Sequence, residues 1–353
     1  MEQTFKSNNF DLLRILAASQ VVLTHSVAHL RLEDNLFVHI SSFFLGVPMF
    51  FVISGFLISA SLERSKDLKS YFLKRGFRIY PALWVCVTLT LPVIYIVGHI
   101  DFYNSATLPW FISQCLGIIY TPQFLESYGF GSYNGSLWTI PIELQFYIAL
   151  PILYAVASRM ASKRWSLNAT IISAFIAFLI FAYLFYTIYP TINLVTETKI
   201  QKLIRYSFAP HFFMFLWGVI LQRFKAYSSR FVNGKGAWFV IVYIAFSFVM
   251  PDNAIFSIIS KLFLGLTTIS LAYTLPTIGE KVLKGNDISY GVYIYHGLIV
   301  GILVELNLTG SYYYALLVFA CSFICGLLSW TYIERPILRR KETKQYIPVG
   351  PKA

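Results

Sequence analysis

The amino-acid sequence predicts an all-α membrane protein that crosses the bilayer about ten times. Of its 353 residues, 57% are hydrophobic and only 12% are charged, whereas soluble proteins carry about 25% charged residues. The mean hydropathy is +0.64, and the apolar residues come in runs close to the ~20 residues that a spanning helix needs. We therefore expect a polytopic membrane protein without an extramembrane domain of ordinary size.

Ten apolar runs are long enough to be considered as spans. They are residues 9–30, 38–60, 80–99, 137–158, 169–188, 208–222, 237–251, 254–275, 288–305 and 312–332. The stretch 107–120 contains Pro109 and lies between polar segments, so we expect it to be an interfacial or re-entrant piece of a long loop.

The basic residues predict the orientation of these spans. If both termini are cytoplasmic, 22 of the 28 basic residues face the cytoplasm, as the positive-inside rule requires. The net charge of +12 is then mostly an orientation signal, and nucleic-acid binding loses its main support. The remaining basic residues are Arg31, Lys199, Lys202 and Arg205 on the outer side and Arg14 and Lys261 within spans.

Several other classes of protein are disfavoured. The four cysteines lie in or beside apolar runs and form neither a disulfide framework nor a metal-ligand set, so we expect no metal. No glycine-rich phosphate loop is present in the sequence to drive transport with ATP, and the N-terminus lacks a signal-peptide cleavage site. We expect one membrane-embedded domain over residues 1–340 and a short basic cytoplasmic tail over residues 341–353.

The first span carries two ionisable residues, and such residues inside a bilayer indicate function by default. Arg14 and His25 are eleven residues apart, which places them on nearly the same helix face about 16 Å apart along the axis. Two plainer interpretations stay open: Arg14 extends to the cytoplasmic headgroups, and His25 is a hydrogen-bonded packing residue.

Paired arginines precede the third span. Arg75 and Arg78 are three residues apart, so on a helix they point the same way and can clamp one anion together, with phosphates as the obvious candidates. The alternative is positive-inside charge held against anionic lipid.

Two further spans contain titratable groups at depth. Glu143 lies about 9 Å inside the outer face, a depth that His25 also reaches, so the two side chains can meet, and a carboxylate beside an imidazole fixes its tautomer and raises its basicity. A structural hydrogen bond is the alternative for Glu143. His296 lies near mid-membrane with Tyr293 one turn away. For His296 two interpretations stay open, a hydrogen bond between helices and a role in a site.

Six stretches in this order resemble the acyltransferase family 3 integral membrane proteins, which O-acylate sugars and cell-envelope glycans. They are Arg14 to His25, Gly46 to Leu57, Arg75 to Pro81, Ser136 to Tyr147, Ser289 to His296 and Glu334-Arg335-Pro336. The match covers most of the chain, although Pro141 stands where the family pattern favours a small residue that is not proline.

The resemblance implies a ten-helix enzyme that passes an acyl group, most simply acetyl from cytoplasmic acetyl-CoA, across the membrane to a glycan hydroxyl. The glycan would be O-antigen, capsule or exopolysaccharide, free or lipid-linked, and the location would be a bacterial inner (plasma) membrane. The chain would be a stand-alone form without the C-terminal esterase-like domain of some relatives.

The resemblance also implies roles for individual residues. His25 and Glu143 would be catalytic, and Arg14, Arg75 and Arg78 would bind the acyl-CoA. The side chains expected to contact the substrate are Trp138, Tyr147, Tyr293 and His296.

Two chemical routes and two rival functions stay open from sequence. His25, oriented by Glu143, either removes the proton from the attacking hydroxyl or is itself acylated and passes the group on. A transporter or flippase of a lipid-linked glycan would also use intramembrane Arg, His and Glu. A sensor or scaffold without chemistry would leave the spacing of Arg14 and His25 unexplained.

Overall fold

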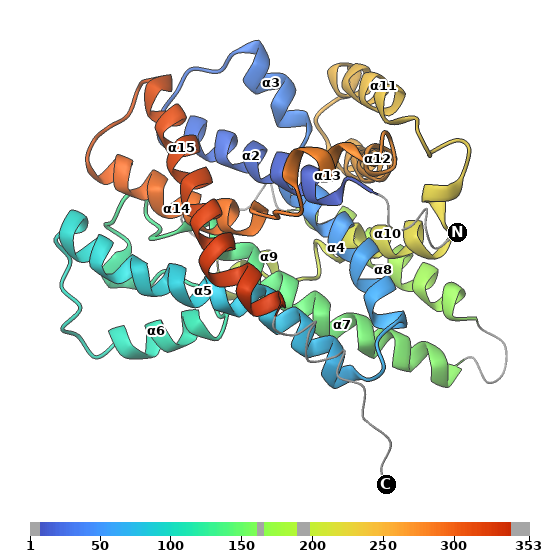
Figure 1. Ribbon diagram of the computed structural model, residues 1–353, viewed down its shortest axis with the longest axis horizontal. Helices are drawn as coiled ribbons and strands as arrows, with labels where there is room; N and C mark the ends of the chain where they lie inside the picture. The colour runs from blue at the N-terminus through green and yellow to red at the C-terminus, as the bar shows by residue number, and fades with distance from the viewer. Residues whose placement is uncertain (1–7, 161–165, 189–197, 340–353) are drawn as a thin grey trace, which may run out of the picture. The chain divides into compact units, whose positions relative to one another are not determined.

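The computed structural model describes residues 8–160, 166–188 and 198–339, and this part of the chain is helical without β-strands. Figure 1 shows the helices along the chain. They are α2 (Phe10–His29), α3 (Leu36–Phe43), α4 (Gly46–Glu63), α5 (Leu68–Gly98), α6 (Thr107–Cys115), α7 (Thr139–Met160), α8 (Leu167–Ile188), α9 (Lys199–Arg205), α10 (Phe212–Arg223), α11 (Gly236–Val249), α12 (Ala254–Ala272), α13 (Ile278–Leu283), α14 (Ser289–Glu305) and α15 (Tyr312–Ser329).

Shorter helical pieces join or extend these helices. Three are 3₁₀ turns, and the last is a π-helical turn that follows α15 directly. They are η1 (Gln123–Leu125), η2 (Gly135–Trp138), η4 (Ala226–Ser228) and η5 (Trp330–Glu334).

Each predicted span is helical, although the one at 38–60 comprises two helices, α3 and α4. This helical structure fits a polytopic all-α membrane protein. Within the described ranges, seven helical segments are long and apolar enough to cross a membrane: Phe10–His29, Leu36–Glu63, Leu68–Gly98, Gly135–Arg159, Leu167–Ile188, Ala254–Ala272 and Tyr312–Arg339. The other three predicted spans are shorter apolar helices, Phe212–Arg223, Gly236–Val249 and Ser289–Glu305. The count of ten spans and the cytoplasmic placement of both termini stay predictions.

Two differences from the sequence expectation concern the third span and the loop after it. The helix α5 begins at Leu68 rather than near Tyr80, so Arg75 and Arg78 lie on the spanning helix itself. The stretch expected to be interfacial or re-entrant contains α6, whose nine residues are too short to span a bilayer. The predicted tail at 341–353 lies outside the described residues.

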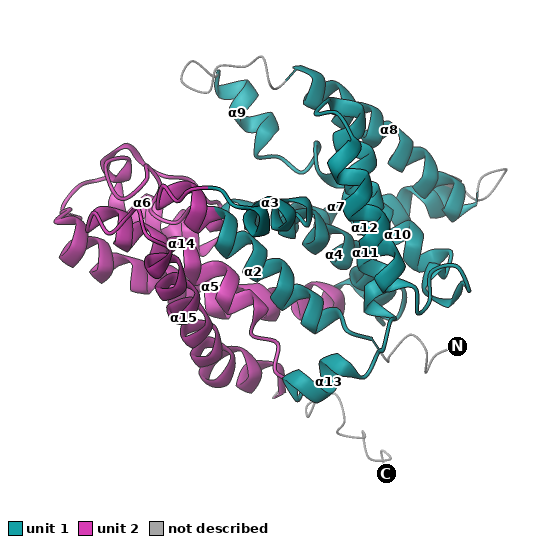
Figure 2. Cartoon of the chain, turned by 90° about the horizontal axis from the view of Figure 1, so that it is seen from above, with its two compact units in different colours: residues 1–24, 34–68, 138–285 teal, residues 25–33, 69–137, 286–353 magenta. Residues whose placement is uncertain are grey.

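The chain divides into two compact units (Figure 2). Unit 1 comprises residues 1–24, 34–68 and 138–285, and unit 2 comprises residues 25–33, 69–137 and 286–353. Each unit is described by itself below.

Unit 1 is built on a close contact between α4 and α10 that only glycine allows. A Cβ added at Gly55 would lie 1.9 Å from the carbonyl oxygen of Phe215, and one at Gly218 would lie 2.1 Å from that of Val52. Without side chains at these positions the two backbones approach directly, which is how helices commonly pack in membranes. Gly55, which belongs to the Gly46 to Leu57 stretch of the family pattern, is therefore a packing residue.

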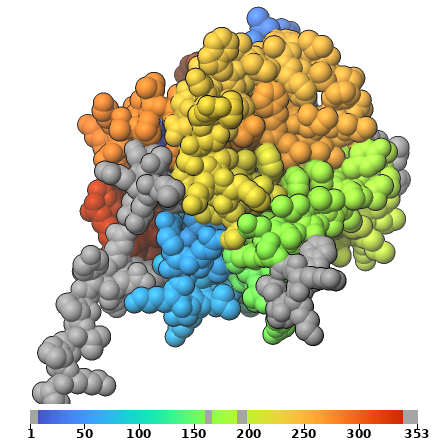
Figure 3. Space-filling model, turned by 90° about the vertical axis from the view of Figure 1, so that its right-hand side faces the viewer, coloured from blue at the N-terminus to red at the C-terminus, as the bar shows by residue number. Residues whose placement is uncertain are grey.

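The outer surface of unit 1 carries large apolar side chains. On α8 Ile176, Ile180 and Leu184 are about half exposed, and on α11 Trp238 and Ile241 are more exposed still. Figure 3 shows this face, with α8 in green and α11 in yellow-orange. The three exposed residues of α8 recur at every fourth position, so they form one apolar stripe along the helix, as contact with lipid requires.

Unit 2 is built around α14, which is buried along most of its length. Gly291 faces Gly326 of α15, since a Cβ at Gly291 would lie 2.7 Å from the Cα of Gly326. The loop before η2 docks on α14 through Asn134, whose Nδ2 donates to the carbonyl oxygen of Ile294 at 2.8 Å. This contact holds the loop between α6 and η2 beside the helix that carries His296.

Candidate active site

Two histidines from distant parts of the sequence are hydrogen-bonded in unit 2. His25 lies on the last residues of α2 and His296 on α14, and Nδ1 of His25 is 3.0 Å from Nε2 of His296. Nδ1 of His296 lies 2.6 Å from the carbonyl oxygen of Tyr293, one turn earlier on the same helix. His296 is fully buried, whereas His25 is only half-buried.

The direction of these bonds can be assigned from their partners. A carbonyl oxygen only accepts, so Nδ1 of His296 carries a proton and donates it to Tyr293. In a neutral ring Nε2 of His296 then has a lone pair and accepts from Nδ1–H of His25. A second proton on His296 would put an unpaired charge in a fully buried side chain, which is costly. In a neutral His25 ring, Nε2 is then the nitrogen without a proton.

The remaining surroundings of His25 come from its own helix and the loop between α6 and η2. His29 lies one turn later with its ring centroid 5.7 Å from that of His25, and Phe130 of the loop stacks on His29 at 3.8 Å. Nε2 of His25 makes no hydrogen bond within the described residues. The atom with the lone pair is thus the one left for a reactant.

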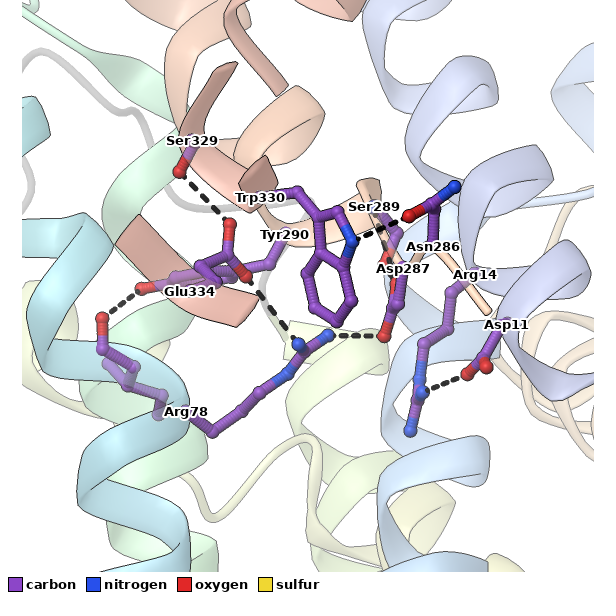
Figure 4. A network of polar contacts seen from close by, with 11 residues as sticks. Asp11, Arg14, Arg78, Asn286, Asp287, Ser289, Tyr290, Ser329, Trp330 and Glu334 are labelled. Carbon is purple, nitrogen blue, oxygen red and sulfur yellow. Dashed lines mark hydrogen bonds and ion pairs between the residues drawn. The ribbon is translucent and has the colours of Figure 1, made fainter. Parts of the chain in front are cut away.

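Arg78 is the centre of a polar network in unit 2 (Figure 4). Its guanidinium forms ion pairs with Asp287, which precedes α14, and with Glu334 of η5, the latter at 3.5 Å. Both carboxyl groups are buried, and Ser329 donates to Glu334 at 3.0 Å. One arginine between two carboxylates leaves no net positive charge at this position.

The π-helical turn explains how Glu334 reaches Arg78. In η5 the chain runs as a π-helix over Trp330–Glu334, and Glu334 is 1% exposed. Such single π turns inside helices often occur at functional sites. The Nε1 of Trp330 donates to Asn286 Oδ1 at 3.0 Å, next to Asp287. The Glu-Arg-Pro motif is therefore tied to the segment before α14.

The other arginines expected to bind the donor have separate settings. Arg75 lies one turn before Arg78 on α5 and is half-buried. Arg14 belongs to unit 1, where its Nη1 donates to Oδ1 of Asp11 at 2.8 Å, a pair that Figure 4 also draws. The role of these three arginines in donor binding stays a prediction.

Glu143 has partners in unit 1. It lies in the second turn of α7 and accepts hydrogen bonds from the hydroxyls of Tyr147 and of Ser54, the latter at 3.4 Å. Pro141 is the third residue of α7, where a missing N–H costs no helical bond. The departure from the family pattern at Pro141 is thus accommodated by the helix start.

Trp138 lies just before α7 in an aromatic group of unit 1. Its ring is 5.6 Å from that of His211 and 6.2 Å from that of Tyr206. His25 and Glu143 belong to different units, so their expected meeting stays a prediction. Of the expected site residues, the structure brings together His25 with His296 and Tyr293, and Glu143 with Tyr147.

Some residues of these sites were not identified from the sequence. Asp287 lies between predicted spans and resembles an ordinary loop residue, and Asn134 lies in a loop whose docking on α14 no local pattern indicates. In the ranges that the structure describes, no three His, Cys, Asp or Glu side chains form a group that would hold a metal ion.

Comparisons with known proteins identify relatives over nearly the whole chain. The model of an acyltransferase domain, acyltransferase family 3, matches residues 7–335. Nodulation protein 10 of Rhizobium leguminosarum bv. viciae is 29% identical, with 94% of this chain and 93% of that protein aligned. The O-acetyl transferase of Shigella phage Sf6 is 26% identical, with 96% of this chain and 98% of that protein aligned.

A third relative is longer than this chain. The peptidoglycan O-acetyltransferase of Listeria monocytogenes is 25% identical over 83% of this chain, and the aligned part is 51% of that protein. No solved structure matches. The family match confirms the resemblance drawn from the six sequence stretches, and this chain belongs to acyltransferase family 3.

Proposed function

We propose that this protein is a membrane-bound O-acetyltransferase that moves an acetyl group from acetyl-CoA to a hydroxyl group of a cell-envelope polysaccharide. The observation that carries this proposal is the bonded pair of His25 and His296, because it leaves a lone pair on Nε2 of His25. The names of the relatives supply the class of reaction: one is an O-acetyl transferase and another acts on peptidoglycan.

In the direct route His25 acts as a general base. Nε2 takes the proton of the acceptor hydroxyl while its oxygen attacks the thioester carbonyl, so a C–O bond forms. The C–S bond then breaks, and the proton on Nε2 passes to the departing thiolate. Proton transfer by a positioned histidine typically contributes 10²–10⁴-fold to the rate.

In the alternative route Nε2 of His25 is the nucleophile. It attacks the thioester carbonyl, so a C–N bond forms, the C–S bond breaks and coenzyme A leaves as the thiolate. The acceptor hydroxyl then attacks the acetyl carbonyl, a C–O bond forms as the C–N bond breaks, and the proton that the hydroxyl releases neutralises the thiolate. Both routes use the same lone pair, so the contact with His296 supports each of them equally.

We propose that the donor, coenzyme A with its acetyl group, binds from the cytoplasmic side. Coenzyme A carries several phosphates, and arginine suits them because its planar fork binds oxyanions in pairs. Arg75 lies one turn before Arg78 on α5, and Arg78 is bonded to Asp287 and Glu334, two carboxylates that a phosphate would have to displace. We propose that Arg75 makes the main phosphate contact from α5, and that Arg78 contributes only if a phosphate displaces one of its carboxylates.

The acceptor is proposed at the level of its class. An O-antigen, capsular or exopolysaccharide repeat, free or lipid-linked, is consistent with the chemistry proposed for His25, and a bacterial inner membrane is the matching location. The choice among these glycans depends on the test below.

The experiment is mass spectrometry of the envelope glycan from cells with the intact gene, with His25→Ala, and with His39→Ala as a matched control. His39 is an exposed histidine of α3 that the proposal does not use. We expect an acetyl-sized mass to vanish in His25→Ala alone, with both variants inserted normally. Unchanged glycan masses with less glycan at the surface would instead favour the flippase.

A further inference from the structure

Lys261 is a charge inside a candidate span that the proposed reaction does not use. It is the eighth residue of α12, about 10 Å from the start of that helix. Ionisable groups at such depth are costly and mark ligand or ion sites by default. Its side chain is half-buried.

The ammonium group of Lys261 is hydrogen-bonded but not neutralised. It donates to the backbone carbonyl and the hydroxyl of Ser257, one turn earlier, at 3.3 and 2.5 Å. It also lies 4.6 Å from the ring centroid of Tyr186, in the last turn of α8. Among the described residues no carboxylate forms an ion pair with it; the acidic group that acts on it electrostatically is Asp252, which is exposed.

An aromatic group lies at the same end of unit 1, where α7 and α10 begin. His211 precedes α10, and its ring contacts Trp138 at 5.6 Å. Nε2 of His211 lies 3.3 Å from the carbonyl oxygen of Arg205, whose guanidinium covers the Tyr206 ring at 4.5 Å. Nε1 of Trp217 on α10 donates at 2.9 Å to the carbonyl oxygen of Leu262, the residue after Lys261 on α12, and α8, α10 and α12 pack against one another in this unit.

The short helix α9 adds further positive charge at this end. Lys199, Lys202 and Arg205 recur at every third residue of α9, so they project from neighbouring positions on the helix. With the predicted orientation they face outward, against the positive-inside tendency. Orientation therefore does not explain these charges, whereas an anionic ligand does.

This end of unit 1 also contains Glu143. Phe51 and Ser54 lie one turn apart on α4: Phe51 contacts the His211 ring at 5.8 Å, and Ser54 donates to Glu143 at 3.4 Å. The aromatic group and the carboxyl group are therefore held by the same helix. A ligand that lies on Trp138 and Tyr206 is therefore near the carboxyl group of Glu143 as well.

We propose that Lys261, with the cations of α9, binds an oxyanion of the acceptor glycan, and that the acceptor is consequently acidic. Flat aromatic rings with a few placed polar groups are the common lining of small-ligand sites, and an ammonium pairs with a carboxylate or a phosphate. This inference rests on the proposed function, because it names the class of acceptor for that reaction. The negative group is a sugar carboxylate or a sugar phosphate, which share this chemistry.

The test compares two oligosaccharides that differ only in charge. The probes are a tetrasaccharide that contains glucuronic acid and the same tetrasaccharide after its carboxyl groups are reduced to alcohols. Equilibrium binding of each is measured to the full-length protein in nanodiscs of phosphatidylcholine, for the wild type, Lys261→Met, Lys261→Arg and Lys281→Met. Lys281 is an exposed lysine of α13 and serves as the matched control.

We expect the wild type to bind the acidic probe about tenfold more tightly than the reduced one, the effect of one charge-assisted hydrogen bond. Lys261→Met should lose this preference, while Lys261→Arg and Lys281→Met keep it. Equal binding of both probes by the wild type, binding of neither, or a preference that survives Lys261→Met would overturn the proposal. So would loss of the preference when phosphatidylglycerol is added, since lipid phosphate would then occupy the site.

Binding is measured without acetyl-CoA, so the two proposals fail in different ways. If the wild type discriminates between the probes but never acetylates a glycan, the proposed reaction is wrong and the oxyanion site stands. If the wild type acetylates glycans but does not discriminate, the reaction stands and the acidic acceptor is wrong. Lys261→Met protein is used only when it elutes from size-exclusion chromatography as the wild type does.

Discussion

Nδ1 of His25 donates to Nε2 of His296 across 3.0 Å, and the carbonyl oxygen of Tyr293 determines that direction by accepting from the other nitrogen of His296. In the proposed reaction His296 therefore acts through His25, as a positioning residue, and its expected contact with the substrate stays a prediction. In the proposed reaction a second imidazole orients His25, a task that a carboxylate commonly performs for a catalytic histidine.

Removal of the acceptor atom at position 296 should slow the chemical step without weakening substrate binding. In His296→Leu the ring of His25 loses its tautomer preference, so a large part of the protein holds the proton on Nε2. We expect kcat to fall about tenfold to a hundredfold, within the range that a positioned base contributes, with KM for acetyl-CoA unchanged. Steady-state kinetics on purified protein measure both values.

The conservative variant His296→Gln separates positioning from packing. The amide oxygen of glutamine can accept from Nδ1–H of His25, so this variant should recover part of the lost kcat. If His296→Gln and His296→Leu are equally slow although both fold, the hydrogen bond is not what matters at this position.

The sequence was sufficient to locate the long apolar helices and His25, for a physical reason. A run of about 20 apolar residues has few alternatives to a helix in lipid, and a histidine inside such a run stands out against it. The partner of His25 could not be found in this way, because His296 is 271 residues away and periodicity relates only residues on one helix. The same limit applies to Asp287, since its neighbour Arg78 lies 209 residues earlier.

The close contact between α4 and α10 predicts a position that tolerates no side chain. Gly55→Ala would place a methyl group 1.9 Å from a backbone oxygen of Phe215, and relief requires movement of the backbone. We expect a loss of about 1–3 kcal/mol or more, seen as a lower melting temperature in detergent and less monodisperse protein in size-exclusion chromatography.

Gly76→Ala is the matched control for this prediction. Gly76 also lies in a helix, but an added Cβ there meets only the Tyr80 side chain at 3.8 Å. The variant should gain up to about 1 kcal/mol of helix propensity. Equal effects of the two substitutions would mean that glycine matters for flexibility rather than for the approach of the helices.

Tyr147 should matter through Glu143. Its hydroxyl donates to the carboxyl group from one turn away on α7, so Tyr147→Phe removes the bond and keeps the ring. A hydrogen bond of this kind is worth about 1 kcal/mol net, and we expect kcat to fall about fivefold. The measurement is the acetylation rate of Tyr147→Phe compared with that of Glu143→Gln. We expect Glu143→Gln to be the slower of the two. If Tyr147→Phe is slower, Tyr147 does not act through Glu143.

The network around Arg78 should be required mainly for stability. Arg78→Ala leaves the carboxyl groups of Asp287 and Glu334 buried side by side without their cation. Loss of one partner from a buried ion pair costs about 3–5 kcal/mol, so we expect a strongly lowered melting temperature. Removal of the carboxyl charge as well, in Arg78→Met with Glu334→Gln, should recover part of that loss because less unpaired charge remains.

Arg75→Ala distinguishes this structural role from phosphate binding, since Arg75 lies one turn away on the same helix face. If the phosphates of coenzyme A bind mainly to Arg75, its loss should raise KM for acetyl-CoA about tenfold or more, as expected for a charge-assisted pair, with little change in melting temperature. A partly folded Arg78→Ala protein, stabilised by chaperone co-expression or lower temperature, should show a KM close to that of the wild type. The opposite pattern, a stable Arg78→Ala variant with greatly raised KM, would make Arg78 the phosphate contact and Asp287 and Glu334 the groups that a phosphate displaces when the donor binds.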